Sequence, residues 1–323
     1  MPITVPTLET LSSTDMLLFA IIQAVVLLLI SPLMAGISRV IKARMQSRRG
    51  PGILQEYRDM VKLMRRQDVS PEASGFISRV MPFVLISSML VIAMALPVIT
   101  LSSPFGGAGD LITIIYLFAL FRFFFSVAGL DSDSVFAGIG ASREVTLGVL
   151  VEPILVLSLI VIALIAGSTN LGVISTSIAT EPFNSFSAWF IAMLACAFAV
   201  FIEMGKIPFD VAEAEQELQE GPLTEYSGPS LALIKLGMSL KQVVIASLFV
   251  GVVFPFGSTA SFTFSSLLGA SVLYFIKLLV VYFAASLVEN SVARGRFLLT
   301  SRVTWVGFSV ATLALVLYYL TGL

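Results

Sequence analysis

Ionisable side chains stand at six places where the surrounding sequence is otherwise apolar. They are Arg122, Glu152, Glu203, Lys235, Lys241 and Lys277. A charge at the middle of a lipid bilayer costs at least about 2.5–3.5 kcal/mol, so such residues usually face the interior of a helix bundle and mark proton or ion paths. The alternatives are structural ion pairs and, for Glu203, Lys235 and Lys241, side chains that reach the membrane surface.

Two of these carboxylates have neighbours that bear on this chemistry. Pro153 follows Glu152 and, because proline has no amide hydrogen, it frees the carbonyl of Val149 as a place for water. Lys206 stands three residues after Glu203, a spacing that lets the two pair on a helix. An ion pair between Lys206 and Glu203 is therefore possible on this spacing.

Further acidic residues gather in "EMGKIPFDVAEAEQELQEGPLTEYSG", residues 203–228, which contains seven carboxylates and one lysine. Pro208 and Gly221 are expected to bound a helix over residues 209–220. On that helix Glu213, Glu217 and Glu220 would share one face and repel one another. Their compensation would come from the arginines of residues 39–79 or from a basic partner protein; the alternative is a solvated acidic loop.

The elements that must position these residues are membrane-spanning helices, because the chain is 57% hydrophobic and only 12% charged. A span needs about 20 mostly apolar residues. We predict eight, over residues 16–37, 80–101, 111–130, 145–166, 187–206, 231–255, 266–289 and 303–321. The predicted fold is an all-α integral membrane bundle forming one domain, 1–323, with loops at about 38–79 and 207–230 that carry short amphipathic helices.

The distribution of positive charge predicts the orientation of this bundle. Residues 1–38 and 303–323 contain no Lys or Arg, and neither do the loops near 102–110, 167–186 and 256–265, whereas residues 38–79 contain ten. Positively charged loops stay in the cytoplasm, so both termini are expected on the outer side of the membrane. The first span reads as an uncleaved anchor rather than a signal peptide.

The first cytoplasmic loop contains a second candidate helix, after the break at residues 50–52. Apolar and aromatic side chains recur there at helical spacing, at Ile53, Tyr57, Met60, Val61 and Met64, with cations between them at Arg58, Lys62, Arg65 and Arg66. This pattern suits a helix on the membrane surface. Its cations are either a docking surface or a solvated positive flank, and no aromatic stacking platform favours nucleic-acid binding.

The chain has no histidine and a single cysteine, Cys196. These numbers exclude haem ligation by histidine, a Cys/His zinc site and a cysteine-held iron–sulfur cluster within this chain, so any redox centre must belong to a partner. Two functions remain: a subunit that relays protons together with soluble partners, or a self-contained transporter. The absence of inverted repeats in the sequence weakens the transporter alternative.

Four segments resemble a known family. They are "SRRGPGILQEYRDMVKLMRRQ", "ALFRFFFSVAGLDSDSVFAGIGASREVTLGVLVEP", "EMGKIPFDVAEAEQELQEGPLTEYSG" and "VENSVARGRFLL". Together they resemble the eight-helix membrane subunit of respiratory complex I that is called subunit 1 in mitochondria. The resemblance is stronger to the related membrane subunit of group 4 [NiFe]-hydrogenases of the formate hydrogenlyase type, and strongest to hydrogenase-4 component C. It covers essentially the whole chain.

The resemblance implies roles for particular residues. The relay would consist of Arg122, Glu144, Glu152, Glu203, Lys206, Lys235, Lys241 and Lys277. The surface that docks the soluble arm would include Arg48, Arg49, Gly50, Pro51, Tyr57, Arg143, Asp210, Glu213, Glu215, Glu217, Glu225, Tyr226 and Arg294. Nickel, iron and iron–sulfur clusters would belong to the hydrogenase and iron–sulfur subunits, and antiporter-like subunits would continue the relay.

Departures from the complex I pattern bear on quinone chemistry. Complex I typically reads AETNRAPFD and GYHTEYSG where this chain has "IEMGKIPFD" and "GPLTEYSG", and an acid found further on in complex I is Met238 here. The resemblance therefore implies a membrane-anchor and proton-coupling subunit of a hydrogenase in a bacterial cytoplasmic membrane, without an active site of its own. The alternative is the quinone-site membrane subunit of a respiratory NADH dehydrogenase, complex I.

Overall fold

The computed structural model describes residues 13–71, 74–106, 108–180, 185–293 and 297–321, with side chains for all of these except 13, 215–216 and 297–299. Within those ranges the regular elements are helices. Eight of them are long and apolar enough to cross a membrane, which confirms the predicted number. They are α1 (Ser13–Met45), α3 (Phe76–Ala95), α4 (Leu111–Asp131), α5 (Val135–Ala166), α7 (Phe186–Glu203), α9 (Gly228–Leu248), α10 (Phe264–Ser291) and α11 (Phe297–Thr321).

Shorter helices fill the connections. α2 (Gln55–Met64) confirms the helix expected in the first loop, and α6 (Leu171–Thr180) follows α5. α8 (Glu215–Leu218) and the 3₁₀ turn η2 (Gly221–Leu223) lie in the acidic segment, while the π-helical turn η3 (Phe249–Val253) extends α9. The described chain is thus a multi-pass membrane bundle.

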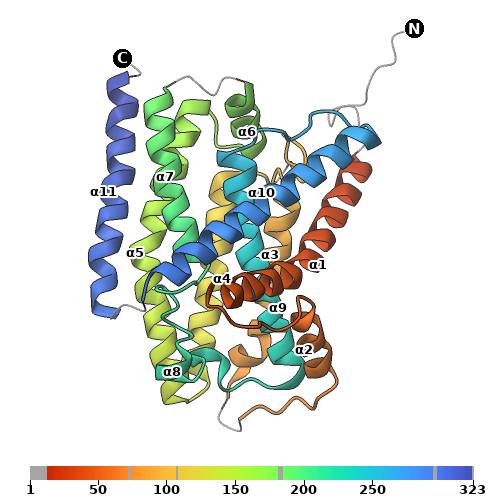
Figure 1. Cartoon of the computed structure of the whole chain (residues 1–323), viewed down its shortest axis with the longest axis vertical. Coiled ribbons are helices and arrows are strands. Elements are labelled where there is room, and N and C mark those ends of the chain that lie inside the picture. The colour runs from red at the N-terminus through yellow and green to blue at the C-terminus, as the bar shows by residue number, and fades with distance from the viewer. Residues whose placement is uncertain (1–12, 72–73, 107, 181–184, 294–296, 322–323) are drawn as a thin grey trace.

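The long helices pack in two groups that share α3 and α9 (Figure 1). α4, α5, α7 and α11 pack side by side, and α1 packs against α3, α9 and the strongly tilted α10. Buried alanines let these helices approach closely. Gln23 of α1 donates to the carbonyls of Ala93 and Leu96, at 2.8 and 2.9 Å, and so satisfies the end of α3 inside the bundle.

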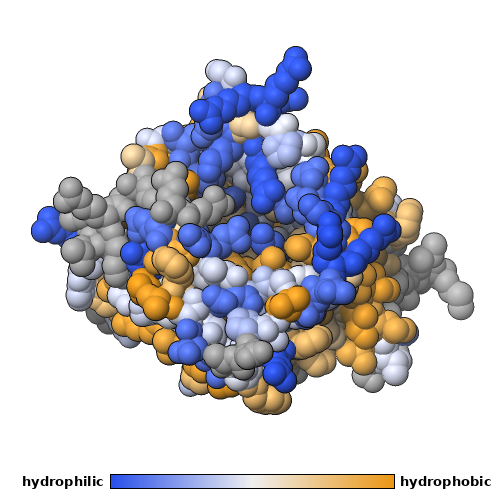
Figure 2. Space-filling model, turned by 90° about the horizontal axis from the view of Figure 1, so that it is seen from below, coloured by the Kyte–Doolittle hydropathy of each residue, from blue (hydrophilic) through white to orange (hydrophobic). Residues whose placement is uncertain are grey.

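The two ends of the bundle differ in polarity. α1 begins and α11 ends at one end, whereas α2 and α8 lie at the other, which we call the charged end (Figure 1). Seen from below, the charged end presents mostly hydrophilic residues, with hydrophobic surface along its edges (Figure 2). The start of α1 and the end of α11 therefore lie opposite α2 and α8, as an even number of crossings requires.

The predicted helix over residues 209–220 is wrong, because only four residues of it, α8, are helical. Gln219, Glu220 and Gly221 adopt φ of 50°, 71° and 56°, which ends the helix. A Cβ at Gly221 would lie 2.1 Å from the carbonyl oxygen of Ala212, so glycine is needed there. The segment instead buries its apolar residues against the bundle, and this packing overrides its helical periodicity.

α5 begins ten residues before the span predicted from residue 145. The polar residues around Arg143 and Glu144 made this region resemble a loop. In the structure both residues lie on a continuous helix that reaches the charged end. A Cβ at Gly140 would lie 2.7 Å from Pro222 Cδ, so this glycine lets the acidic segment approach α5 closely.

Candidate functional site

Five charged side chains from four helices meet in one cluster, which we call the charge cluster: Arg122, Lys241, Glu144, Glu152 and Glu203. Four of them are largely buried, whereas 39% of the Glu152 side chain is exposed. Arg122 of α4 donates to Glu152 of α5 and to Glu203 of α7, and its Nε lies 3.4 Å from Glu144 Oε1. Lys241 Nζ of α9 lies 3.1 Å from Glu203 Oε2 and 3.9 Å from Glu144 Oε1. The structure therefore brings together five of the eight predicted relay residues.

Local packing holds the charge cluster in place. Arg122 lies against Gly148, where a Cβ would stand 2.6 Å from Arg122 Cδ. Lys241 Nζ lies 5.4 Å from the centre of the Phe121 ring, within the range of a cation–π interaction. Only 5% of the Glu203 side chain is exposed. A charge buried this deeply must be paired and hydrogen-bonded, and two cations satisfy Glu203.

The charge cluster contains more acidic than basic groups. Three carboxylates face two cations, so the fully ionised cluster has one excess negative charge. Like charges repel more strongly in a low-dielectric interior than in water, so the carboxylates depend on Arg122 and Lys241 to stay close together.

Two neighbouring cavities lie between the charge cluster and the charged end, and they share lining residues. A polar cavity of about 60 Å³ touches Arg122, Glu144, Glu203 and Lys241 and can hold a small number of water molecules. A second, of about 310 Å³, lies between α1, α9 and the acidic segment. Both cavities are lined by the same five residues: Gly205, Asp210, Glu213, Met238 and Gln242.

Glu213 occupies the junction between the two cavities. Burial, together with the nearby carboxylates of Asp210 and Glu144, raises the pKa of Glu213 from 4.5 to about 8, although Lys241 opposes this shift and Glu220 adds to it. A pKa of about 8 favours the protonated form of Glu213 at neutral pH, where an ordinary glutamate is ionised. That property, at the junction of the two cavities, suits a residue that passes protons between them.

The ion pair that sequence spacing allowed between Glu203 and Lys206 does not form. Lys206 lies past the end of α7, and its Nζ is 2.8 Å from Ser38 Oγ and 4.0 Å from Glu289 Oε2. Lys42 Nζ lies 2.7 Å from the other oxygen of Glu289. Glu203 pairs across the bundle because its helix turns it toward Arg122 and Lys241, while the turn after α7 directs Lys206 to α1 and α10. Burial lowers the pKa of Lys206.

The expected carboxylate face of the acidic segment is also wrong, since its members diverge. Glu217 Oε2 lies 2.6 Å from Arg143 Nη1, and Glu220 Oε2 lies 3.6 Å from Lys235 Nζ. Glu213 instead lines the two cavities. The negative charges of Glu217 and Glu220 are thus compensated by Arg143 of α5 and Lys235 of α9, rather than by the arginines of the first loop.

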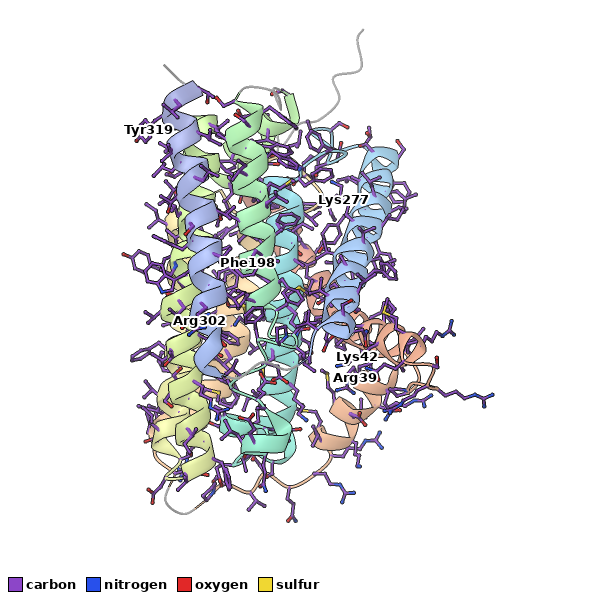
Figure 3. All side chains as sticks on the ribbon, turned by 60° about the vertical axis from the view of Figure 1, so that its left-hand side comes forward. Arg39, Lys42, Phe198, Lys277, Arg302 and Tyr319 are labelled. Carbon is purple, nitrogen blue, oxygen red and sulfur yellow. The ribbon has the colours of Figure 1, made fainter. Side chains whose placement is uncertain are left out.

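The two remaining predicted relay residues lie apart from the charge cluster. Lys235 pairs with Glu220 at a half-exposed position. Lys277 Nζ donates to the carbonyl of Phe254, at 3.0 Å, and lies over the ring of the same residue. Figure 3 shows Lys277 well above Arg39 and Lys42, toward the end of the bundle where α1 begins and α11 ends. Among the described residues Lys277 has no carboxylate within ion-pair distance.

The predicted docking residues occupy the charged end, with different degrees of exposure. Arg48, Arg49 and Pro51 are exposed, and Gly50 packs against Ala43. Tyr57 donates to the carbonyl of Leu29 and so fixes α2 against α1.

The end of the acidic segment makes contacts that stabilise the fold. Tyr226 donates to the carbonyl of Ser78, at 2.8 Å, and burial raises the pKa of Tyr226 to about 12. Glu225 is half-buried beside it. The side chain of Glu215 and all of Arg294 lie outside the described residues.

Two carboxylates were missed by the sequence analysis. Glu289 neutralises Lys42 and Lys206, and the buried Glu56 lies 2.7 Å from Arg39. Glu289 could have been found as the one acid at the end of its predicted span. Among the described residues, no group of three or more His, Cys, Asp or Glu side chains is arranged to hold a metal ion.

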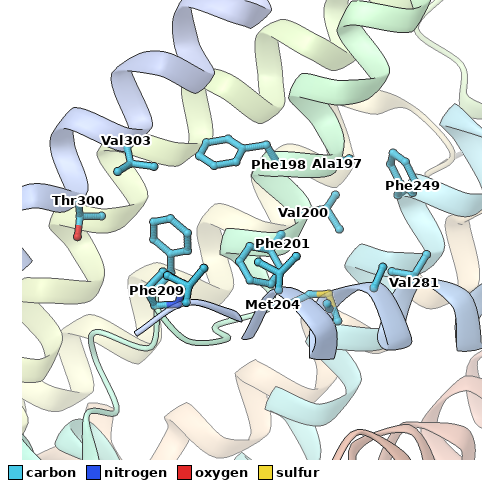
Figure 4. A pocket seen from close by; sticks show the side chains of 15 residues that line it. Ala197, Phe198, Val200, Phe201, Met204, Phe209, Phe249, Val281, Thr300 and Val303 are labelled. Atoms are coloured by element: carbon cyan, nitrogen blue, oxygen red, sulfur yellow. The ribbon is translucent and has the colours of Figure 1, made fainter. Parts of the chain in front are cut away.

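An apolar cavity of about 550 Å³ lies outside this site, between α7, α10 and α11 (Figure 4). Phe198, Phe201 and Phe209 line it together with aliphatic residues, and Thr300 supplies a hydroxyl. None of the described residues that line it is ionisable. These residues therefore offer no group for proton exchange.

Comparisons with known proteins agree on one family. The family model described as NADH dehydrogenase matches residues 17–320. Hydrogenase-4 component C of Escherichia coli is 61% identical over 98% of this chain and 99% of its own length, and formate hydrogenlyase subunit 4 of the same organism is 54% identical over 93% and 97%. NADH-quinone oxidoreductase subunit 8 of Rhodothermus marinus is 30% identical over 74% and 73%.

The fold has a solved counterpart in the membrane-bound sulfane sulfur reductase, an archaeal respiratory membrane complex. One chain of that structure superposes with a TM-score of 0.82, at 22% identity, over 94% of this chain and 99% of its own length. Eight apolar helices, matches along nearly the full length and a shared fold lead to the same conclusion. The chain belongs to the NADH dehydrogenase family of membrane subunits and is a close homologue of hydrogenase-4 component C and formate hydrogenlyase subunit 4.

Proposed function

We propose that this chain is the membrane subunit of a proton-reducing [NiFe]-hydrogenase complex, which anchors the hydrogenase arm and hands protons between the aqueous phase and the membrane. The names of the two most similar relatives given above support the class of complex. The cations at the charged end support its placement in the cytoplasm, with both termini outside a bacterial cytoplasmic membrane.

One observation carries the proton-handling proposal: Glu213 lines both the outer cavity and the cavity of the charge cluster. A proton that enters from the charged end reaches Glu213, whose pKa near 8 lets it bind and release protons at neutral pH. From Glu213 it passes through water to Glu144 or Glu203, where Arg122 and Lys241 hold the carboxylates in place. Antiporter-like subunits continue the path within the membrane.

The charged end is the proposed docking surface for the hydrogenase arm. Glu217 is about half exposed while it contacts Arg143, so a partner can reach its carboxylate. Glu217→Lys should weaken retention of the arm on membranes. The double variant Arg143→Glu with Glu217→Arg restores the internal pair with reversed charges. If the double variant retains the arm like the native protein, the carboxylate of Glu217 has only a structural role and docking does not use it.

The proposed partners are the hydrogenase large and small subunits, iron–sulfur subunits and antiporter-like membrane subunits. Nickel, iron and the iron–sulfur clusters reside in those partners. Purification of the intact complex in a mild detergent, followed by protein identification and metal analysis, tests this assignment. Nickel, iron and antiporter-like chains should co-purify with this subunit, and a complex without nickel would contradict the proposal.

A quinone-reducing complex is the second candidate, supported by the similarity to a subunit of NADH-quinone oxidoreductase. The polar lining of the 310 Å³ cavity disfavours it, because Arg39, Lys42, Glu213 and Glu289 offer little apolar surface to a quinone ring. Quinone depletion separates the two candidates. Hydrogen evolution should persist without quinone, whereas loss of electron transfer on depletion would favour the second candidate.

A further inference from the structure

A groove between α1 and α2 opens at the edge of the charged end. It has a volume of about 960 Å³, and Leu33 of α1 with Tyr57 and Val61 of α2 form its apolar floor. Val61 is 52% exposed and Leu29, one turn before Leu33, is 59% exposed. The floor therefore continues into the apolar outer surface of α1, the surface that faces lipid in a membrane.

Four cations of α2 and the residues after it line the same groove: Arg58, Lys62, Arg65 and Arg66. All four are exposed, and in the described part of the chain none has a carboxylate within ion-pair distance. The two acidic residues of α2 make other contacts. Glu56 lies against Arg39, and Asp59 accepts a hydrogen bond from Gln55.

The exposed cations that line the groove place its rim at the depth of the lipid headgroups, because cationic side chains near a membrane reach for the interface. The other side of the groove reaches the apolar part of α1. The Tyr57 hydroxyl donates to the carbonyl of Leu29, which lies inside the apolar span predicted over residues 16–37, ten residues before Arg39. Figure 2 shows hydrophilic side chains beside hydrophobic surface on the side of the charged end where α2 lies.

We propose that the α1–α2 groove binds an anionic phospholipid. The phosphate group contacts the cations of the rim, and one acyl chain lies on Leu33 and Val61. Both halves of this ligand match the groove, because clustered cations on an amphipathic helix attract anionic headgroups and the floor is apolar. A soluble acidic protein would match the cations but not an apolar floor that continues into the lipid-facing surface of α1.

Native mass spectrometry of the full chain, exchanged into mixed phosphatidylcholine and phosphatidylglycerol, tests the proposal. The native chain should retain phosphatidylglycerol in preference to phosphatidylcholine. The triple variant Arg58→Gln, Lys62→Gln, Arg65→Gln should lower that preference at least tenfold, since each cation near the surface contributes about fivefold. The matched control is Arg44→Gln, Arg48→Gln, Arg49→Gln, which removes three exposed cations outside the groove and should retain the preference.

Val61→Trp tests the acyl-chain half of the site, because it fills the floor and leaves every cation in place. Phosphatidylglycerol retention should fall, while added glycerol phosphate should fail to compete in the native chain. If the groove triple variant and the control triple variant lost the preference for phosphatidylglycerol to the same extent, the proposal would be overturned in favour of general charge attraction. Competition by glycerol phosphate, or unchanged retention in Val61→Trp, would overturn it in favour of a site for free anions.

Discussion

Replacing Glu213 by glutamine should abolish a pH dependence that the structure assigns to this one carboxyl group. Because the pKa of Glu213 is higher in the folded protein, about 8, than its ordinary value of 4.5, the folded state loses stability as the pH rises between these two values. At about 1.4 kcal/mol per pKa unit the full shift amounts to about 5 kcal/mol, and partial exposure of the side chain reduces the expected effect to about 2–3 kcal/mol.

Thermal unfolding of the purified chain between pH 5.5 and pH 8.5 measures this effect. The native chain should lose stability relative to Glu213→Gln as the pH rises, because glutamine resembles the protonated glutamate and does not ionise. Infrared spectroscopy should also detect a protonated carboxyl in the native chain that disappears around pH 8. Glu213→Asp keeps a titratable group and should preserve the pH dependence. Parallel stability curves for the native chain and Glu213→Gln would refute the assignment.

Three further substitutions test the packing of the site. Arg122→Gln leaves three carboxylates around a single lysine and should lower the free energy of unfolding by about 3–5 kcal/mol, measured by denaturant titration in detergent. Gly148→Ala should cost about 1–3 kcal/mol by displacing Arg122, whereas Gly269→Ala, where a Cβ would meet nothing, should be nearly neutral in the same assay. Tyr226→Phe removes the hydrogen bond to Ser78 and should cost about 1–2 kcal/mol without altering proton translocation in vesicles.

The bundle was predictable because length and hydropathy determine membrane spans almost alone. Each of the eight predicted spans has its helix, and the charged residues within them were recognised because charge is costly in lipid. The ion-pair partners of these charged residues were not predictable from the sequence. Arg122 and Glu203 are 81 residues apart in the chain, and only the packing of α5 against both α4 and α7 brings them together.

The acidic segment shows where local patterns mislead. Its i, i+4, i+7 carboxylates predicted one helix face, but positive φ angles at Gln219 and Glu220 end the helix after four residues. Burial of neighbouring apolar residues against α5 then sends Glu213 inward and Glu217 outward. Residues at helical spacing share a face only if the segment is helical. In the acidic segment tertiary packing prevents a longer helix, so the predicted face does not form.

The charge cluster is proposed to pass protons while the subunit anchors its complex. Proton translocation coupled to hydrogen evolution, measured in inverted membrane vesicles containing Glu203→Gln, tests this role most directly, with Asp59→Asn on α2 as a control far from the charge cluster. We expect Glu203→Gln to lose translocation while the complex stays assembled, and Asp59→Asn to translocate normally. If an assembled Glu203→Gln complex translocated protons as fast as the native complex, the proposed role would be contradicted.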